Sequence, residues 1–340
     1  MTSPAPVPPE SSVARLSVAA VDKAAVTRRI TTLSVGTAVI LIALKAFAMG
    51  ASGSVSILAS LTDSALDLAA SLATFYAVRW AAAPPDADHH YGHGKGEAMS
   101  ALVQAGLIFA SAVFIGWEAL HRIFDPRPVQ AGGWAVGVIV ISIALTAALV
   151  WMQDRAVRET GSIAVAGDRS HYAADLAANV VVLIGVISGS FLHAPGLDAA
   201  AGLVVAIWLV WGAFGLMKGA ADHLLDRSAS DADHDTVVKA VLADPAITGL
   251  HALRTRMAGS TLMIQMHVDL DPALTLEAAH AIVDAAEGRI RTAIPDSDVL
   301  IHPDPAGTQN SEPATRAPSP ARAETGDRPL GNPSVRGPWS

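Results

Sequence analysis

The sequence of 340 residues contains no cysteine, so thiolate metal sites, disulfide bonds and cysteine nucleophiles are excluded. Any metal site must use histidine and carboxylate ligands, which suit borderline ions such as Zn²⁺ or Fe²⁺ better than Cu⁺. The chain has no basic run of the kind that binds nucleic acid, and its net charge is −8. Neither a phosphate-binding G-x-x-x-x-G-K-[ST] loop nor an H-E-x-x-H motif occurs, which argues against ATP use and against a zinc protease.

Charged residues are scarce as well: they make up 16% of the chain, whereas 51% is hydrophobic and the mean hydropathy is +0.41. Soluble domains usually carry about 25% charged residues. Apolar segments of about 20 residues are long enough to cross ~30 Å of hydrocarbon. Six such segments are predicted, at 31–49, 55–81, 97–123, 134–152, 162–191 and 197–217. The sequence therefore predicts a multi-pass membrane protein with a soluble part.

Lysine and arginine gather on one side of these segments, and by the positive-inside rule this predicts that both termini are cytoplasmic. The expected location is the cell inner membrane. Residues 1–25 are predicted to be a disordered cytoplasmic lead. Lys45, near the outer end of the first segment, is expected to extend its ammonium to the membrane interface. A role in an ion path is the alternative for Lys45.

Two pairs of polar residues interrupt the apolar segments with a spacing of four. Asp63 and Asp67 share a helix face, and His171 and Asp175 repeat the spacing in the fifth segment. Each charge in hydrocarbon costs roughly 2.5 kcal/mol on insertion scales. Three carboxylates and one imidazole match one tetrahedral divalent metal. Proton relays or neutralisation by nearby Lys and Arg are alternatives, but doubled ligand pairs favour a metal.

The loop over 84–97 is rich in histidine, and Asp86, His89 and His93 form a second candidate metal site. A solvated loop that binds metal only weakly is an alternative of similar weight. Glycines at 92, 94 and 96 allow sharp turns before the third helix.

From residue 222 to 305 the composition is that of a soluble domain. The pattern predicts a helix at 231–243, strands at 249–257 and 261–269 joined by a hairpin, a helix at 276–294 with Thr275 as N-cap, and a strand at 298–302 stopped by Pro303. The order α-β-β-α-β is that of a truncated ferredoxin-like domain. The predicted fold class is an all-α six-helix transmembrane domain followed by this small α+β cytoplasmic domain. The predicted domains are 26–222 and 223–305, and 306–340 is a disordered tail.

The soluble part contains a third group of candidate ligands. They are His251, His267, His280, His302 and Asp304. A single histidine of this kind is more often a surface residue. Because several of them fall at the ends of strands, their joint placement favours a metal site at one end of the sheet.

Taken together, these residues resemble the cation diffusion facilitator family, in its bacterial zinc and ferrous-iron efflux branch. The resemblance covers roughly 25–305. It rests on Gly-Ser-Val-Ser-Ile-Leu at 53–58, Asp63-x-x-x-Asp67, Tyr-Gly-His-Gly-Lys at 91–95, His171-x-x-x-Asp175, Leu-Asp-Arg at 225–227 and Leu-Arg-Thr-Arg at 253–256. The family implies a homodimer in the lipid bilayer that exchanges cytoplasmic divalent metal for external protons. It implies a transporter and not an enzyme.

Carried over to this sequence, the resemblance implies three sites and one ion pair. The transport site is Asp63, Asp67, His171 and Asp175; the loop site is Asp86, His89 and His93; the cytoplasmic site at the dimer interface is His251, His267, His280, His302 and Asp304; the pair that ties the membrane dimer is Lys95 and Asp226. Zn²⁺ is the expected ion, with Cd²⁺, Fe²⁺ and Co²⁺ as further substrates and no organic cofactor. The alternative is a membrane-bound metal sensor that does not transport.

Overall fold

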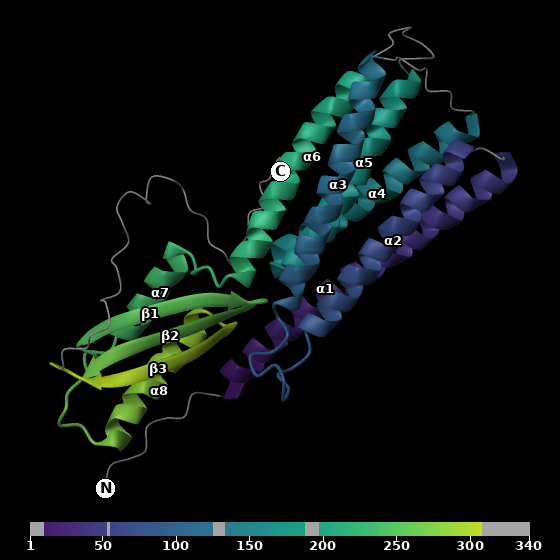
Figure 1. Cartoon of the computed structure of the whole chain (residues 1–340). Helices are drawn as coiled ribbons and strands as arrows, with labels where there is room; N and C mark the ends of the chain where they lie inside the picture. The colour runs from purple at the N-terminus through teal and green to yellow at the C-terminus, as the bar shows by residue number, and fades with distance from the viewer. Residues whose placement is uncertain (1–9, 53–54, 125–132, 188–196, 308–340) are drawn as a thin grey trace. The chain divides into compact units, whose positions relative to one another are not determined.

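The computed structural model describes residues 10–52, 55–124, 133–187 and 197–307 (Figure 1). The chain divides into two compact units, one over Val26–Leu224 and one that contains Leu225 onward together with the start of the chain. Each unit is described by itself below.

Helices form most of the first unit, and a described loop at 82–95 joins the second helix to the third. Its helices are α1 (Glu10–Ser52), α2 (Val55–Ala81), α3 (Gly96–Phe124), α4 (Gly133–Thr160), α5 (Ile163–Ile187) and α6 (Leu197–Leu224). The prediction of a disordered lead is wrong for residues 10–25, which form the first turns of α1. The prolines of the lead all precede Glu10, and the alanine, leucine, lysine and arginine that follow favour a helix. Residues 1–9 of the predicted lead and 308–340 of the predicted tail lie outside the described residues.

Four of these helices are long and apolar enough to cross a membrane. They span Lys23–Ala48, Gly96–Phe124, Val136–Thr160 and Ala199–Leu224 within the described residues. Helices α2 and α5, also predicted as spans, are not among these four. Both carry ionisable residues in their middle turns, Asp63 and Asp67 in α2 and His171 and Asp175 in α5. Helices of this composition face the interior of a bundle, where the polar groups find partners.

Small residues allow α5 to pack closely against its neighbours. A Cβ atom added to Gly167 of α5 would lie 3.2 Å from the Cα atom of Ala101 in α3. Ala166 of α5 packs with Ala156 of α4 and Ile30 of α1 in one apolar cluster. Helix α5 therefore lies at the centre of the contacts that bring α1, α3 and α4 together.

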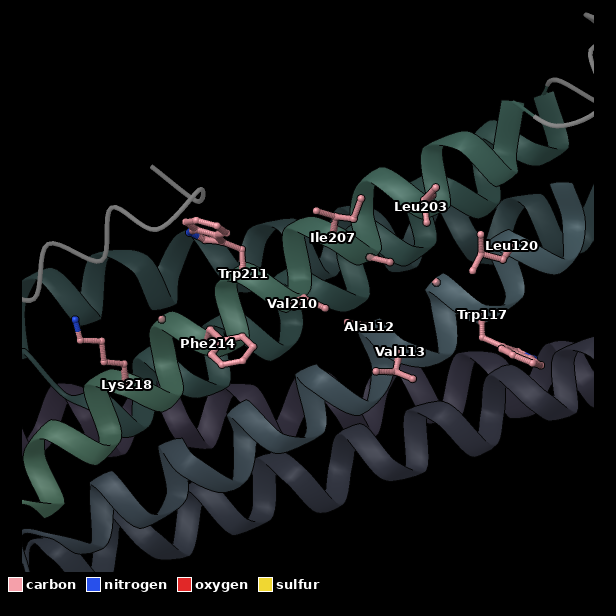
Figure 2. Close-up of a pocket in the computed structure, with 13 residues that line it drawn as sticks. Ala112, Val113, Trp117, Leu120, Leu203, Ile207, Val210, Trp211, Phe214 and Lys218 are labelled. Carbon is pink, nitrogen blue, oxygen red and sulfur yellow. The ribbon is translucent and has the colours of Figure 1, made fainter.

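An apolar groove of about 1040 Å³ lies between α3 and α6 (Figure 2). Small residues line part of it, where Gly116 of α3 meets Ala206 of α6. Its walls carry large exposed side chains, among them Trp117 and Trp211, and Lys218 lies at one end. Such a lining suits lipid acyl chains better than water.

The second unit is an α/β domain whose element order confirms the predicted α-β-β-α-β. Its elements are α7 (Asp231–Leu242), β1 (Gly249–Ala258), β2 (Thr261–Leu270), α8 (Leu276–Ala293) and β3 (Ser297–Pro305). The sheet has the order β1-β2-β3, with β1 antiparallel and β3 parallel to β2. Gly259 turns the hairpin with a positive φ of 65°, and the Thr275 side chain caps α8 by accepting from the Ala278 N–H at 3.2 Å.

Alternate residues of β2 form the core of this domain, and the residues between them belong to the other face of the sheet. In β2, Leu262, Ile264, Met266, Val268 and Leu270 are buried and pack against α7 and α8. Successive side chains of a strand point to opposite faces. His267 and Asp269 therefore point to the face that α7 and α8 do not cover.

The prediction that Pro303 stops the last strand is wrong, because β3 continues to Pro305. In the register of the parallel pair, Pro303 lies opposite Val268 and Asp304 opposite Asp269. Proline lacks an N–H to donate but is tolerated in an edge strand, and β3 is at the edge of the sheet. The longer strand places Asp304 on the same face as His302.

Candidate metal sites

A buried cluster of three ionisable side chains joins α2 to α5. His171 Nε2 lies 3.3 Å from Asp67 Oδ1 and 3.7 Å from Asp175 Oδ2. One ligand atom from each residue lies within 4.8 Å of the other two. Asp67 and His171 are both 6% exposed and the Asp175 side chain is 20% exposed, so the surrounding helices cover most of this cluster. Two carboxylates and one imidazole at this separation form a suitable set of ligands for a divalent cation.

The hydrogen bonding of Asp175 also indicates a binding site. Its Oδ2 atom is buried and has no hydrogen-bond partner among the described residues. A buried acceptor left without a donor costs about 1–3 kcal/mol, and more when it is charged. A cation or a proton at Asp175 would remove this cost.

Asp63, the fourth predicted ligand, is not part of this cluster. The buried stripe of α2 runs through Ser64, Asp67, Ser71 and Thr74, whereas Asp63 is exposed. Its assignment as a ligand stays a prediction, and binding through Asp63 requires a change of its side chain or of its helix.

Lys45 does not extend to the membrane interface as expected. Its side chain is buried, with 6% exposed, and its Nζ donates to the hydroxyl of Ser64 at 2.6 Å. A lysine side chain is long enough to reach either the interface or the interior, so the sequence alone did not decide between them.

A buried carboxylate that the sequence analysis missed lies one helical turn from His171. Asp168 is 1% exposed and accepts a hydrogen bond from Gln153 Nε2 at 2.8 Å and one from Ser71 Oγ at 3.4 Å. Ser71 also pairs with the Tyr172 hydroxyl at 2.7 Å, and that hydroxyl donates to the Ser34 carbonyl at 3.2 Å. The network links α1, α2, α4 and α5. The three-residue spacing from Asp168 to His171, which places both on one face of a helix, is the sequence feature that could have identified Asp168.

The loop between α2 and α3 brings Asp86, His89 and His93 together, with ligand atoms within 4.8 Å of one another. Asp86 Oδ2 lies 3.2 Å from His93 Nε2, and Asp86 Oδ1 lies 3.4 Å from His89 Nδ1. The ring of His93 is buried against Trp80, at 5.3 Å between centroids. Its Nε2 is the ring atom that faces Asp86 and that a neutral His93 would offer to a shared metal, whereas its Nδ1 is buried and has no hydrogen-bond partner among the described residues.

Backbone geometry holds Asp86 in its ionised form. The N–H of His89 and then that of Asp88 donate to its Oδ1 at 2.7 and 2.9 Å, and these bonds hold the pKa of Asp86 below its ordinary value. Gly92 adopts a positive φ of 77°, and its N–H donates to the His89 carbonyl at 2.9 Å. The predicted turn at Gly92 is therefore present.

The open face of the sheet in the second unit carries a row of histidines. His251 pairs with His267 across β1 and β2, and His267 pairs with His302 across β2 and β3. Their ring centroids are 5.2 and 4.8 Å apart. A shift of register follows His251, with Ala252 at a positive φ of 51°, and such bulges redirect the side chains beside them.

Asp304 is at the centre of this row. Its Oδ2 lies 2.8 Å from His267 Nδ1 and 3.3 Å from His251 Nε2, and its Oδ1 lies 3.2 Å from His302 Nε2. Burial raises the pKa of Asp304, but the hydrogen bond from His267 and the charges of His302, His267 and His251 outweigh burial and lower it. The ligand atoms of His251, His267 and Asp304 lie within 4.8 Å of one another.

His280 does not join these residues within one chain. It lies on α8, which covers the opposite face of the sheet, and its Nε2 is 3.5 Å from Asp284 Oδ2. Lys95 and Asp226 belong to different units, so their predicted ion pair stays a prediction. Within their own units, Lys95 Nζ donates to the Leu224 carbonyl at 3.3 Å, and Asp226 lies 3.5 Å from Arg256 Nη1.

Comparison with known proteins identifies the class to which this fold and these sites belong. Residues 31–225 match the family described as the cation efflux transmembrane domain, and residues 229–306 match the cytoplasmic domain of cation efflux proteins. The chain belongs to the cation diffusion facilitator family, as the resemblance predicted, and is a multi-pass membrane transporter of cations.

Among its relatives are proteins named cation-efflux pump FieF. The one from Shewanella oneidensis is 41% identical over 274 residues, which cover 80% of this chain and 92% of that protein. The one from Klebsiella pneumoniae is 39% identical over 267 residues, which cover 78% of this chain and 88% of that protein.

Proposed function

We propose that the protein exports a divalent metal ion, most readily Zn²⁺, from the cytoplasm in exchange for protons. The observation that carries this proposal is the buried cluster of Asp67, His171 and Asp175, with an oxygen of Asp175 that has no hydrogen-bond partner among the described residues. Such a cluster can hold either a metal ion or protons, but it is costly when it holds neither. That property couples the export of the metal ion to the entry of protons.

The coupling follows from the chemistry of the ligands. A metal ion binds the neutral imidazole of His171 and ionised carboxylates, so protons and metal compete for the same atoms. We propose that Asp63 completes the set in a conformation different from this one, and that alternating access exposes the four ligands to either side. Protons that enter from outside would displace the metal, and their release to the cytoplasm would restore the site.

Zn²⁺ is favoured because one imidazole stands among oxygen ligands. The affinity order of divalent ions does not by itself select among Zn²⁺, Cd²⁺, Fe²⁺ and Co²⁺, so these ions are further candidate substrates. We propose the domains as 26–222 for transport and 223–305 for cytoplasmic metal binding, with both termini in the cytoplasm at the inner membrane.

The other two clusters support accessory roles. We propose that Asp86, His89 and His93 form a loop site, and that His251, His267, His302 and Asp304 hold Zn²⁺ on the open face of the sheet. That face is available to a second copy of the chain, so this site would lie at the interface of a homodimer. His280 would contribute only from the partner protomer, and Lys95 and Asp226 would tie the membrane dimer together.

The experiment that tests transport is metal uptake into sealed vesicles that contain the purified protein, under an imposed pH gradient. Zn²⁺, Fe²⁺, Cd²⁺ and Mn²⁺ are compared for the parent and for Asp67→Ala. Flux that follows the gradient and disappears in Asp67→Ala would support the antiporter, and the ranking of ions would assign the substrate. Zinc binding without gradient-driven flux would instead favour a metal sensor, the second candidate.

A further inference from the structure

One positive charge lies beside the transport cluster without being part of it. Lys45 of α1 is buried, and its ammonium donates to the Ser64 hydroxyl of α2 at 2.6 Å. A buried ammonium is costly unless charges of opposite sign lie near it. The position of Lys45 therefore requires an electrostatic explanation.

The carboxylates of the cluster supply that explanation. Ser64 directly follows Asp63 and lies three residues before Asp67, so it shares the buried face of α2 with Asp67. The ammonium of Lys45 interacts electrostatically with the carboxylates of Asp63 and Asp175. Lys45 thus faces the ligands from α1, while Asp67 and Asp175 approach from α2 and α5.

The formal charges fit one divalent ion. The carboxylates of Asp63, Asp67 and Asp175 contribute three negative charges, a divalent ion contributes two positive charges and His171 binds as the neutral base. One negative charge remains, and the ammonium of Lys45 balances it. Asp168, the nearby carboxylate on α5, is left out of this count because it already accepts hydrogen bonds from Gln153 and Ser71 in a separate network.

We propose that Lys45 is a fixed counter-charge that matches the transport cluster to a divalent ion and promotes its release. This inference rests on the proposed function. When metal is absent, the ammonium stabilises the carboxylates. When metal is present, the ammonium repels it, so binding is weaker and release is faster than the carboxylates alone would give.

The test compares four variants at pH 8, where protons compete least. Lys45→Met removes the charge and keeps an unbranched side chain, Lys45→Arg keeps the charge, and Ser64→Ala removes only the hydrogen bond. Lys218→Met is the matched control, because Lys218 is an exposed lysine of the same unit at the end of the apolar groove (Figure 2). Zinc uptake into vesicles gives KM and maximal rate for each variant.

Lys45→Met is expected to lower the KM for zinc about tenfold, equivalent to ~1.4 kcal/mol, and to reduce the maximal rate. Lys45→Arg, Ser64→Ala and Lys218→Met should keep the parental KM within a small factor. An unchanged or raised KM in Lys45→Met would overturn the proposal.

Thermal unfolding in detergent, with and without zinc, gives a second readout that needs no transport. Lys45→Met should be less stable than the parent without zinc and should gain more from zinc than the parent does. If Lys45→Met loses the same amount of thermal stability with zinc as without it, Lys45 has a purely structural role and the proposal is overturned. Absence of gradient-driven flux in the parent would reject the antiporter but would leave this comparison valid. If Lys45→Met does not fold, Lys45→Gln is measured in its place.

Discussion

Replacement of Asp304 by asparagine should abolish metal binding by the cytoplasmic cluster while the fold is kept. Asparagine has the same shape, but it removes the negative charge that three histidines approach at 2.8, 3.3 and 3.2 Å. Loss of residues that only support a metal ligand lowers affinity by about 10- to 100-fold. Loss of a ligand itself should therefore lower zinc affinity by at least about 100-fold, or ~2.7 kcal/mol.

The stability of the metal-free domain should change much less. A hydrogen bond to a charged group contributes about 1.5–3 kcal/mol when it is buried. The side chains of His267 and Asp304 are 33% and 13% exposed, so solvent reduces this value to about 1 kcal/mol. For a domain of this size, that loss lowers the unfolding midpoint by roughly 4–8 °C.

The assay is competition for zinc between a chromogenic chelator and the full-length protein in detergent, with Asp67→Ala and His89→Ala present throughout to silence the transport and loop clusters. His234→Ala is the matched control, since His234 lies on α7, which packs against the opposite face of the sheet, and belongs to none of the candidate sites. If Asp304→Asn binds zinc within threefold of its parent, Asp304 is not a ligand and the proposed site must be redrawn around His302.

Three further predictions concern other parts of the molecule. Gln153→Leu removes the donor 2.8 Å from the buried Asp168 carboxylate and should cost about 1–3 kcal/mol, seen as a lower unfolding midpoint in detergent; an unchanged midpoint would contradict the network. Gly167→Ala places a Cβ 3.2 Å from the Ala101 Cα and should destabilise by about 1–3 kcal/mol, whereas Gly106→Ala, with open space around it, should not; equal midpoints would argue against close packing of α3 and α5. Because its native pKa is lowered, Asp304 should stabilise the metal-free domain above its unfolded pKa of about 3.9, and this contribution should be lost as pH falls through the native pKa. The free energies of unfolding of the parent and Asp304→Asn should therefore converge in acid, and a difference that persists there would refute this role of Asp304.

The sequence predicted the elements of the soluble domain to within a few residues because its patterns are local. Alternation in β2, the hairpin glycine and the Thr275 cap each depend on a few neighbouring residues. The end of β3 was missed because the tolerance for Pro303 depends on its position at the edge of the sheet. That position is a property of strand order, which no local pattern contains.

The metal clusters were predictable in composition but not in full geometry. Spacing placed Asp63 and Asp67 on one face, but packing buries only Asp67. The direction of the Lys45 side chain depends on which neighbour offers a partner, and that neighbour, Ser64, is on another helix. Contacts between helices therefore determine which candidate side chains point into the buried cluster, and the spacing along a single helix does not show them.

The differing burial of the three clusters argues for different tasks. Asp86 and His89 are 52% exposed, so water can solvate the loop cluster when it holds no ion. Asp67 and His171 are buried and the Asp175 side chain is 20% exposed, so water would solvate that cluster less well when it holds no ion, and protons or the counter-charge of Lys45 would have to stabilise it. Coupled exchange is therefore expected only at the buried cluster. Simple, concentration-dependent binding is expected at the exposed one, which suits a site that receives metal ions without driving their movement.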